Sequence, residues 1–237
     1  MIRIAVHGTG RMAFALDQAA SGNDDVEIVA LAGPREPDWE TGVATVPTLE
    51  DLPAKPDFLV DFTLPEGTRI AAAWCRANGV PLVSGVTGLP DDVIAELRTA
   101  ATTVPVLWSP NLSLGVNLLA DLAGRAGAVL DDDVPVAIED IHHQWKKDAP
   151  SGTALMLGER VAGGRGGNDE AIAYSSIREG EVVGEHSVRF TLAGEEFELV
   201  HRASDRSIYA LGAISAGRWL MQQQPGFYSA RDWLAGM

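Results

Sequence analysis

The chain has 237 residues, which is enough for one large domain or two smaller ones with a buried core. Its net charge of -15 and sequence pI of about 4.6 argue against non-specific binding to nucleic acid or to an anionic membrane. With a single cysteine, Cys75, it can form no internal disulfide, and it starts in a strand pattern without the apolar run of a signal peptide or a membrane span, so we expect a cytoplasmic protein.

The first segment has the pattern of a strand, a glycine turn and a helix. Residues 2–6 (IRIAV) are apolar except for Arg3, and residues 7–13 (HGTGRMA) fit G-x-G-x-x-A before an Ala- and Leu-rich helix that runs to about Ala20. The glycines allow a tight turn and let the backbone approach a pyrophosphate, which the helix N-terminus stabilises. This placement favours dinucleotide binding. The alternative is a turn that only lets the helix pack closely against the strand.

The second strand, residues 26–32, bears on the choice of nucleotide. A dinucleotide-binding unit usually has an Asp or Glu here for the adenosine ribose, but this chain has Gly33-Pro34-Arg35. Arg35 and Arg11 would tolerate or prefer a 2′-phosphate, which inclines the interpretation towards NADPH while leaving NADH open. Arg35 as a solvated loop residue beside Glu36 is an equal alternative. Residues 36–56 are expected to be a connector.

Strands and helices then alternate along residues 58–108. The apolar run at residues 58–62 (FLVDF) is typical of a parallel strand buried on both faces, and further strands are predicted at residues 81–84 and 104–108. Helices are predicted between them, from about residue 65 to 77 and from 91 to 101. The alternation indicates a doubly wound parallel sheet, whose ligands bind beyond the carboxyl ends of the strands. Thr63, residues 85–87 and residues 109–111 lie at such ends.

The remaining residues predict a second, smaller domain. A long helix from residue 113 to about 130 is followed by a strand at residues 134–141, a second helix after Ser151 and a glycine-rich loop at residues 163–168 that we expect to be mobile. Residues 172–178, 186–192 and 197–203 alternate like strands, and no helix separates the last two, so their sheet is at least partly antiparallel. A helix from residue 207 to about 222 and an aromatic-rich tail end the chain.

Residues 139–153 (EDIHHQWKKDAPSGT) gather cations in an otherwise acidic chain. Ser151 is a plausible N-cap, so the backbone of Gly152 and Thr153 could hold a carboxylate or phosphate, with His and Lys near enough to donate protons. A solvated basic loop is the alternative. Adjacent His142 and His143 at a strand end point to opposite faces, which argues against a metal site.

The sequence resembles the 4-hydroxy-tetrahydrodipicolinate reductase (dihydrodipicolinate reductase) family of the lysine and diaminopimelate pathway. The resemblance spans nearly the whole chain, and its most specific part is HHQWKKDAPSGTA, at residues 142–154. Other matching stretches are residues 8–12, 60–63, 65–68, 85–88, 111–117, 178–180, 184–186 and 201–204.

The resemblance implies an α/β fold: an N-terminal Rossmann-like domain of residues 1–112 and 207–237, and an α+β substrate and oligomerisation domain of residues 113–206 with a mixed sheet. It also implies a homotetramer, a small dicarboxylate substrate, and NADPH or NADH as the cofactor. His142 and Lys146 would donate the proton, and His143, Gly152 and Thr153 would bind the substrate. The resemblance implies cofactor contacts from Gly8, Thr9, Gly10, Arg11, Met12, Gly85, Val86, Thr87, Ser109, Pro110, Asn111 and Leu112. Arg35 joins them as the candidate partner of a 2′-phosphate.

The chain departs from the family pattern in ways that bear on the cofactor more than on the reaction. Ala13 replaces a usual glycine, Val86 replaces a frequent Thr, Leu112 replaces a frequent Phe, Pro34 lies near the usual ribose-binding acid, and the linker around Gly163 is short. Two alternatives are a non-catalytic nucleotide-sensing homologue and a reductase of another small cyclic or dicarboxylate substrate.

Overall fold

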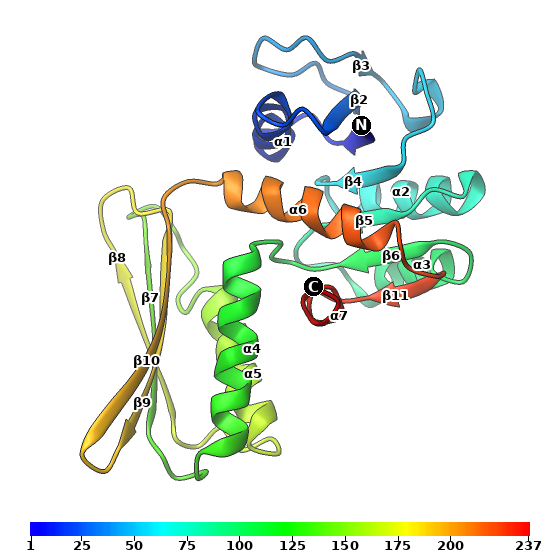
Figure 1. The fold of residues 1–237 in the computed structure, drawn as a ribbon. Helices are drawn as coiled ribbons and strands as arrows, with labels where there is room; N and C mark the ends of the chain where they lie inside the picture. The colour runs from blue at the N-terminus through cyan, green and yellow to red at the C-terminus, as the bar shows by residue number, and fades with distance from the viewer. The chain divides into compact units, whose positions relative to one another are not determined.

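The computed structural model describes residues 1–237, and the chain forms two compact units. Unit 1 consists of Met1–Ser113 and Ser207–Met237, and unit 2 of Leu114–Arg206. Figure 1 traces both along the chain. No helix combines the length and the apolar character that crossing a bilayer requires.

Unit 1 is built on a seven-stranded parallel sheet in the order β11-β6-β5-β4-β1-β2-β3. The order reverses between β1 and β4, which is where doubly wound sheets bind ligands. The strands are β1 (Ile2–His7), β2 (Val26–Ala32), β3 (Thr45–Val46), β4 (Phe58–Asp61), β5 (Leu82–Ser84), β6 (Pro105–Trp108) and β11 (Gly226–Tyr228).

Helices cover both faces of this sheet (Figure 1). The Phe58 ring lies against Gly217 of α6, where an added Cβ would stand 2.1 Å from it, whereas Leu59 belongs to a core cluster with residues of the opposite helices, such as Ala72. Successive β4 side chains are therefore buried on opposite faces, as the apolar run predicts. One face carries α1 (Arg11–Ser21) and α6 (Ser207–Leu220), the other carries α2 (Pro65–Asn78) and α3 (Asp91–Ala100), and α7 (Ala230–Ala235) packs against β11 and α6.

Unit 2 is a four-stranded mixed sheet in the order β10-β9-β7-β8, with two helices on one face (Figure 1). The β7 and β8 strands are parallel, and α5 connects them, whereas β9 pairs antiparallel with both β7 and β10. The two helices, α4 and α5, pack so closely that a Cβ added to Gly127 would lie 2.5 Å from the Val161 carbonyl oxygen. The elements are α4 (Leu114–Val129), β7 (Val136–His142), α5 (Gly152–Gly164), β8 (Ile172–Arg178), β9 (Gly184–Leu192) and β10 (Glu195–Ala203).

The structure confirms the predicted fold class, corrects two local expectations and adds two elements in the C-terminal tail. The connector at residues 36–56 contains β3 and a 3-10 helix at Leu49–Asp51, because β3 adds to the sheet edge beside β2. The aromatic tail, for which no strand or helix was predicted, forms β11 and α7. The predicted loop at residues 163–168 begins later, because α5 continues through Gly164, and the turn follows at Gly166 and Gly167 with positive φ.

Candidate functional site

The loops that follow β1, β4, β5 and β6 are joined at the carboxyl edge of the unit 1 sheet. The Gly8 amide donates to the Ala32 carbonyl (2.8 Å), and the Gly85 amide donates to the Asp61 carbonyl (3.0 Å). The Phe62 and Ser109 amides likewise donate to His7 (3.0 Å) and Ser84 (3.1 Å). The predicted cofactor stretches at residues 8–12, 85–87 and 109–112 therefore emerge at one edge of the sheet, beside its switch point.

The first glycine turn has the shape that a pyrophosphate needs. Gly8 has φ +122°, and an added Cβ would lie 3.1 Å from the Phe62 carbonyl oxygen, so a side chain there is both strained and crowded. Gly10 caps α1 without any side-chain hydrogen bond, and an added Cβ there would meet no atom within 4 Å. The first turn of α1 carries no acidic residue. An open glycine at a helix start without a side-chain cap fits a dinucleotide phosphate.

The loop after β2 lies against this turn. A Cβ added to Gly33 would be 3.1 Å from the Thr9 methyl carbon. Arg35 follows this contact by only two residues. Arg11 and Arg35 are both exposed and form no ion pair within the protein. Two guanidinium groups, one on the first residue of α1 and one on the loop after β2, therefore lie near the glycine turn without an ion-pair partner.

Hydrogen bonds hold the two later stretches that are predicted to contact the cofactor, residues 85–87 and 109–112. The Trp108 indole donates to the Val86 carbonyl at 2.9 Å, and the Ser109 hydroxyl donates to the Asn111 carbonyl at 2.6 Å. The side chains of Val86 and Leu112 are buried, so these two residues can present mainly backbone to a ligand. A Cβ on Gly85 would lie 2.3 Å from the Phe62 ring, which shows how closely the neighbouring loops pack.

Sequence reasoning missed a buried carboxylate at this edge, Asp61. Its oxygens accept from the Thr63 amide (3.1 Å) and hydroxyl (2.6 Å), the Thr68 hydroxyl (2.7 Å) and the Ser84 hydroxyl (3.0 Å). These bonds tie the ends of β4 and β5 to the start of α2. An acidic residue inside the apolar run FLVDF was the available signal, because a buried carboxylate must find several donors.

In unit 2, strand register places a polar cluster at one end of the sheet face that α4 and α5 cover. Asp140 pairs with Ser176 on β8 and His186 on β9, and His142 pairs with Arg178. Paired residues share a face, and alternate residues along a strand return to it. The same face is apolar farther along, where Ile138, Val188 and Phe190 are fully buried.

His142 is the last residue of β7 and is 9% exposed. Its Nδ1 atom lies 3.1 Å from Asp140 Oδ2, although the two are not aligned for a hydrogen bond, and its ring meets the His186 ring edge-on at 5.0 Å. Burial and the charges of Lys146 and Arg178 lower the pKa of His142, while Asp140 opposes them. A bound dianion would add to the effect of Asp140 and favour the protonated imidazole.

Lys146 and His143 lie in the loop that follows β7. The Lys146 amide donates to the His143 carbonyl at 3.1 Å, and Lys146 Nζ pairs with Asp148 Oδ2 at 2.8 Å. The Lys146 side chain is largely sheltered, in contrast to the exposed Lys147. The His143 ring stacks obliquely beside Trp145, with 5.9 Å between ring centres.

The start of α5 confirms the N-cap expected at Ser151. Its hydroxyl accepts from the Ala154 amide at 3.2 Å and lies 3.3 Å from His186 Nε2. Gly152 is exposed, and a Cβ there would meet nothing within 4 Å; Thr153 follows it in the first turn, which has no acidic residue. The amide dipoles at this helix start favour an anion.

The cluster also contains residues that sequence reasoning did not assign to the site. Arg178 Nη2 lies 3.0 Å from Asp140 Oδ2 and donates to the Asp148 carbonyl at 2.6 Å, and the Ser176 hydroxyl donates to Asp140 Oδ1. Burial, followed by the nearby His142, lowers the pKa of His186 to about 4. Arg178 and His186 belong to stretches that carry the family resemblance, which was the only signal for them. No group of three or more His, Cys, Asp or Glu side chains is arranged to hold a metal ion.

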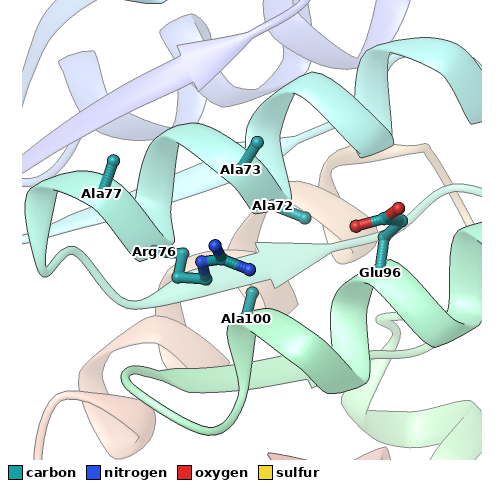
Figure 2. Close-up of a pocket in the computed structure, with 6 residues that line it drawn as sticks. All are labelled: Ala72, Ala73, Arg76, Ala77, Glu96 and Ala100. Atoms are coloured by element: carbon teal, nitrogen blue, oxygen red, sulfur yellow. The ribbon is translucent and has the colours of Figure 1, made fainter.

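A separate hollow of about 330 Å³ lies between α2 and α3 of unit 1 (Figure 2). Its only charged groups are Arg76 and Glu96, and alanines form the rest of its lining. It contains none of the predicted site residues.

The buried histidines predict an acid-sensitive stability. Because the folded pKa of His186 is near 4 and the unfolded value is near 6.5, the unfolded chain binds the proton more readily between these values. The contribution of His186 to the free energy of unfolding should therefore be fully present above about pH 6.5. It should fall by about 3 kcal/mol as the pH drops towards 4. Urea unfolding at a series of pH values measures this, and His186→Gln should flatten the curve. An equally steep curve in that variant would assign the acid sensitivity to other groups.

Both halves of the chain match models of one family. Residues 2–112 match "Dihydrodipicolinate reductase, N-terminus" and residues 115–234 match "Dihydrodipicolinate reductase, C-terminus". The 4-hydroxy-tetrahydrodipicolinate reductase of Stenotrophomonas maltophilia is 44% identical over 242 residues, which cover 98% of each chain. The enzyme of the same name from Alkalilimnicola ehrlichii is 39% identical over 260 residues, covering 97% of each.

A solved structure has the same fold over nearly the whole chain. The dipicolinate-bound dihydrodipicolinate reductase from Paenisporosarcina sp. TG-14 superposes with a TM-score of 0.86, at 24% identity and 97% coverage of both chains. The two family models together cover almost every residue, and the relatives are matched from end to end. The chain belongs to the dihydrodipicolinate reductase family.

Proposed function

We propose that the chain reduces 4-hydroxy-tetrahydrodipicolinate to tetrahydrodipicolinate, with His142 and Lys146 supplying the proton and unit 1 holding the nucleotide. It is an oxidoreductase of lysine (diaminopimelate) biosynthesis, in keeping with the family and the names of its full-length relatives. The observation that carries the assignment of roles is the unit 2 cluster, where a sheltered lysine, a buried histidine and an open helix start occur together.

The nucleotide is held by the carboxyl edge of the unit 1 sheet in this proposal. Gly8 and Gly10 give the backbone room for the pyrophosphate, and the amides of Arg11 and Met12 in the first turn of α1 face it. The stretches Gly85–Thr87 and Ser109–Leu112 contribute further backbone contacts. When bound, the reduced nicotinamide supplies a hydride.

The residues of unit 2 bind the dicarboxylate and provide the proton. The α5 start at Gly152 and Thr153 takes one carboxylate through backbone amides and a hydroxyl, and His143 contacts the substrate from the loop after β7. Overall, the substrate loses its 4-hydroxyl group as water and gains the hydride and one proton. Protonated His142 or the Lys146 ammonium donates that proton. A positioned acid of this kind typically contributes about 10²- to 10⁴-fold in rate. The Lys146 charge also keeps the dianion in place.

The assay for this proposal follows loss of nicotinamide absorbance with freshly generated substrate and either NADPH or NADH. Turnover with at least one nucleotide supports the assignment. Nucleotide binding in a thermal-shift experiment without any turnover would instead indicate a nucleotide-sensing protein, and turnover only with competing cyclic or dicarboxylate substrates would identify another reductase.

The free guanidinium of Arg35 predicts a nucleotide preference. Because it lies just beyond the loop that touches Thr9, it can pair with the 2′-phosphate that only NADPH carries. Arg35→Glu should raise the Kd for NADPH about tenfold or more and change the Kd for NADH much less. Fluorescence titration with both nucleotides measures the difference. An equal change in both would remove Arg35 from the cofactor site.

We also propose a cytoplasmic homotetramer. The face of the unit 2 sheet away from α4 and α5 exposes Ile177 and Val200, and no helix of unit 2 covers it. A second copy of the chain could bury these residues. Light scattering coupled to size-exclusion chromatography measures the mass, and a mass of one or two chains at micromolar concentration would contradict the homotetramer.

A further inference from the structure

The carboxylate of Asp140 is fully buried at the polar end of the unit 2 sheet and contacts groups from several segments. Oδ2 lies 3.0 Å from Arg178 Nη2, 3.1 Å from His142 Nδ1 and 3.3 Å from the Ser151 amide nitrogen. Oδ1 accepts from the Ser176 hydroxyl. Without water to solvate it, the carboxylate depends on these groups, and together they fix its place.

Two of these contacts, those of Ser151 and Arg178, connect Asp140 to the parts of the site that we propose bind the substrate. Ser151 caps α5, so its amide bond to Asp140 sets where the helix start lies. Arg178 bridges Asp140 to the Asp148 carbonyl at 2.6 Å, and the Asp148 carboxylate pairs with Lys146 Nζ. The same buried carboxylate is thus connected to the anion-binding helix start and to the lysine.

The third contact determines which nitrogen of His142 is available. Nδ1 faces Asp140 and is buried, which leaves Nε2 for a ligand. Gly184 on β9 lies beside Nε2, and an added Cβ would stand only 3.2 Å from that atom. A side chain at position 184 would crowd the nitrogen that must reach the substrate. The 3.1 Å between Nδ1 and Asp140 Oδ2 is within hydrogen-bond distance, although the two groups are not aligned in the structure.

We propose that Asp140 is a positioning residue of the reduction: it holds the Nδ1–H of His142, so that Nε2 carries the transferable proton. This inference rests on the proton-donating role proposed above for His142. Two cations disfavour the charge on this imidazole, namely Lys146 from the loop after β7 and Arg178 from β8. The His186 ring of β9 meets it edge-on. Asp140 is the negative charge that opposes the two cations, in the way a carboxylate orients and stabilises an imidazolium.

The test is a titration of His142 by NMR in the full-length protein labelled with ¹³C and ¹⁵N in histidine. His142 is assigned by the signal that disappears in His142→Gln. In Asp140→Asn, which keeps the shape and removes the charge, the pKa of His142 should fall by about one unit or more. Ser176→Ala is the matched control, since it removes a partner of Asp140 but keeps the carboxylate, and it should leave the His142 titration nearly unchanged.

Kinetics of the same variants add a second measurement. In Asp140→Asn, kcat should fall about tenfold or more at neutral pH, and the alkaline limb of the pH profile should move to lower pH, because less of His142 is protonated. The Kd for the nucleotide, which unit 1 binds, should be unchanged. An unshifted pH profile would mean that Asp140 acts only on folding and would overturn the inference.

The tautomer of neutral His142 in the wild-type protein gives a test that needs no variant to fold. The ¹⁵N shifts should place the proton on Nδ1, and a proton on Nε2 would overturn the proposal. Failure of the proposed function is a different result, namely a wild-type protein that turns over no substrate. If the wild type is active but His142 titrates identically in Asp140→Asn, only the role of Asp140 is wrong.

Discussion

Replacing Lys146 with methionine is expected to lower kcat by about 10²-fold or more, with a smaller rise in KM for the dicarboxylate substrate. The ammonium is sheltered and lies in the loop that joins the buried His142 to the start of α5, where we propose that a substrate carboxylate binds. Methionine keeps most of the side-chain length and removes both the proton and the charge. Steady-state kinetics at saturating nucleotide measure kcat and KM separately, and a fall in kcat would show that the loss occurs after binding.

The adjacent Lys147 provides the matched control for this prediction. It carries the same charge one residue away but is exposed, so Lys147→Met should change kcat by less than about twofold. The ion pair between Lys146 and the exposed Asp148 carboxylate adds little to stability, so Lys146→Met should unfold close to the wild-type temperature. Equal kcat losses in the two variants would point to general electrostatic attraction and would contradict a proton-donating role for Lys146.

The sequence predicts those parts of the fold whose own residues decide their structure. The run at residues 58–62 indicates a strand because burial on both faces demands apolar side chains throughout, and β4 is buried along its length. Ser151 predicts a helix start because its hydroxyl satisfies an amide three residues ahead, and that bond is present. Local chemistry was sufficient in both cases.

The missed elements owe their structure to distant partners. The β11 strand is three residues long and exists because Phe227 pairs with Val106 of β6, more than a hundred residues earlier. The β3 strand has two residues and joins the edge of β2 in the same way. Neither segment has enough residues to show an alternating pattern, so no local signal distinguished it from loop.

In the candidate site, too, some residues were recognisable from local sequence and others depend on distant partners. The segment containing His142 and Lys146 stands out locally, because cations there precede a capped helix. Asp140 and Arg178 are 38 residues apart and meet through the parallel register of β7 and β8. Single-sequence patterns do not fix the register between separate strands, so the buried network could not be assembled from them.

A methyl group added to the first glycine turn is expected to abolish most nucleotide binding. Substitutions at Gly8 and Gly10 distinguish loss through backbone strain from loss of the space for a phosphate. At Gly8 the backbone has φ +122°, and the new Cβ would crowd the Phe62 carbonyl oxygen. Gly8→Ala should therefore lose about 1–3 kcal/mol of folding stability and also weaken the nucleotide. Urea unfolding and fluorescence titration of NADPH and NADH measure the two effects.

At Gly10 the same methyl group tests the pyrophosphate position without straining the fold. The residue has φ -102°, which alanine adopts readily, and the added Cβ meets no protein atom within 4 Å. Gly10→Ala should cost no more than about 1 kcal/mol of folding stability, the difference between glycine and alanine at a helix N-cap. Its Kd for either nucleotide should still rise about tenfold or more, because the methyl group occupies the space that lets a phosphate approach the start of α1. If Gly10→Ala is stable and binds nucleotide as tightly as the wild type, the pyrophosphate does not lie at this turn.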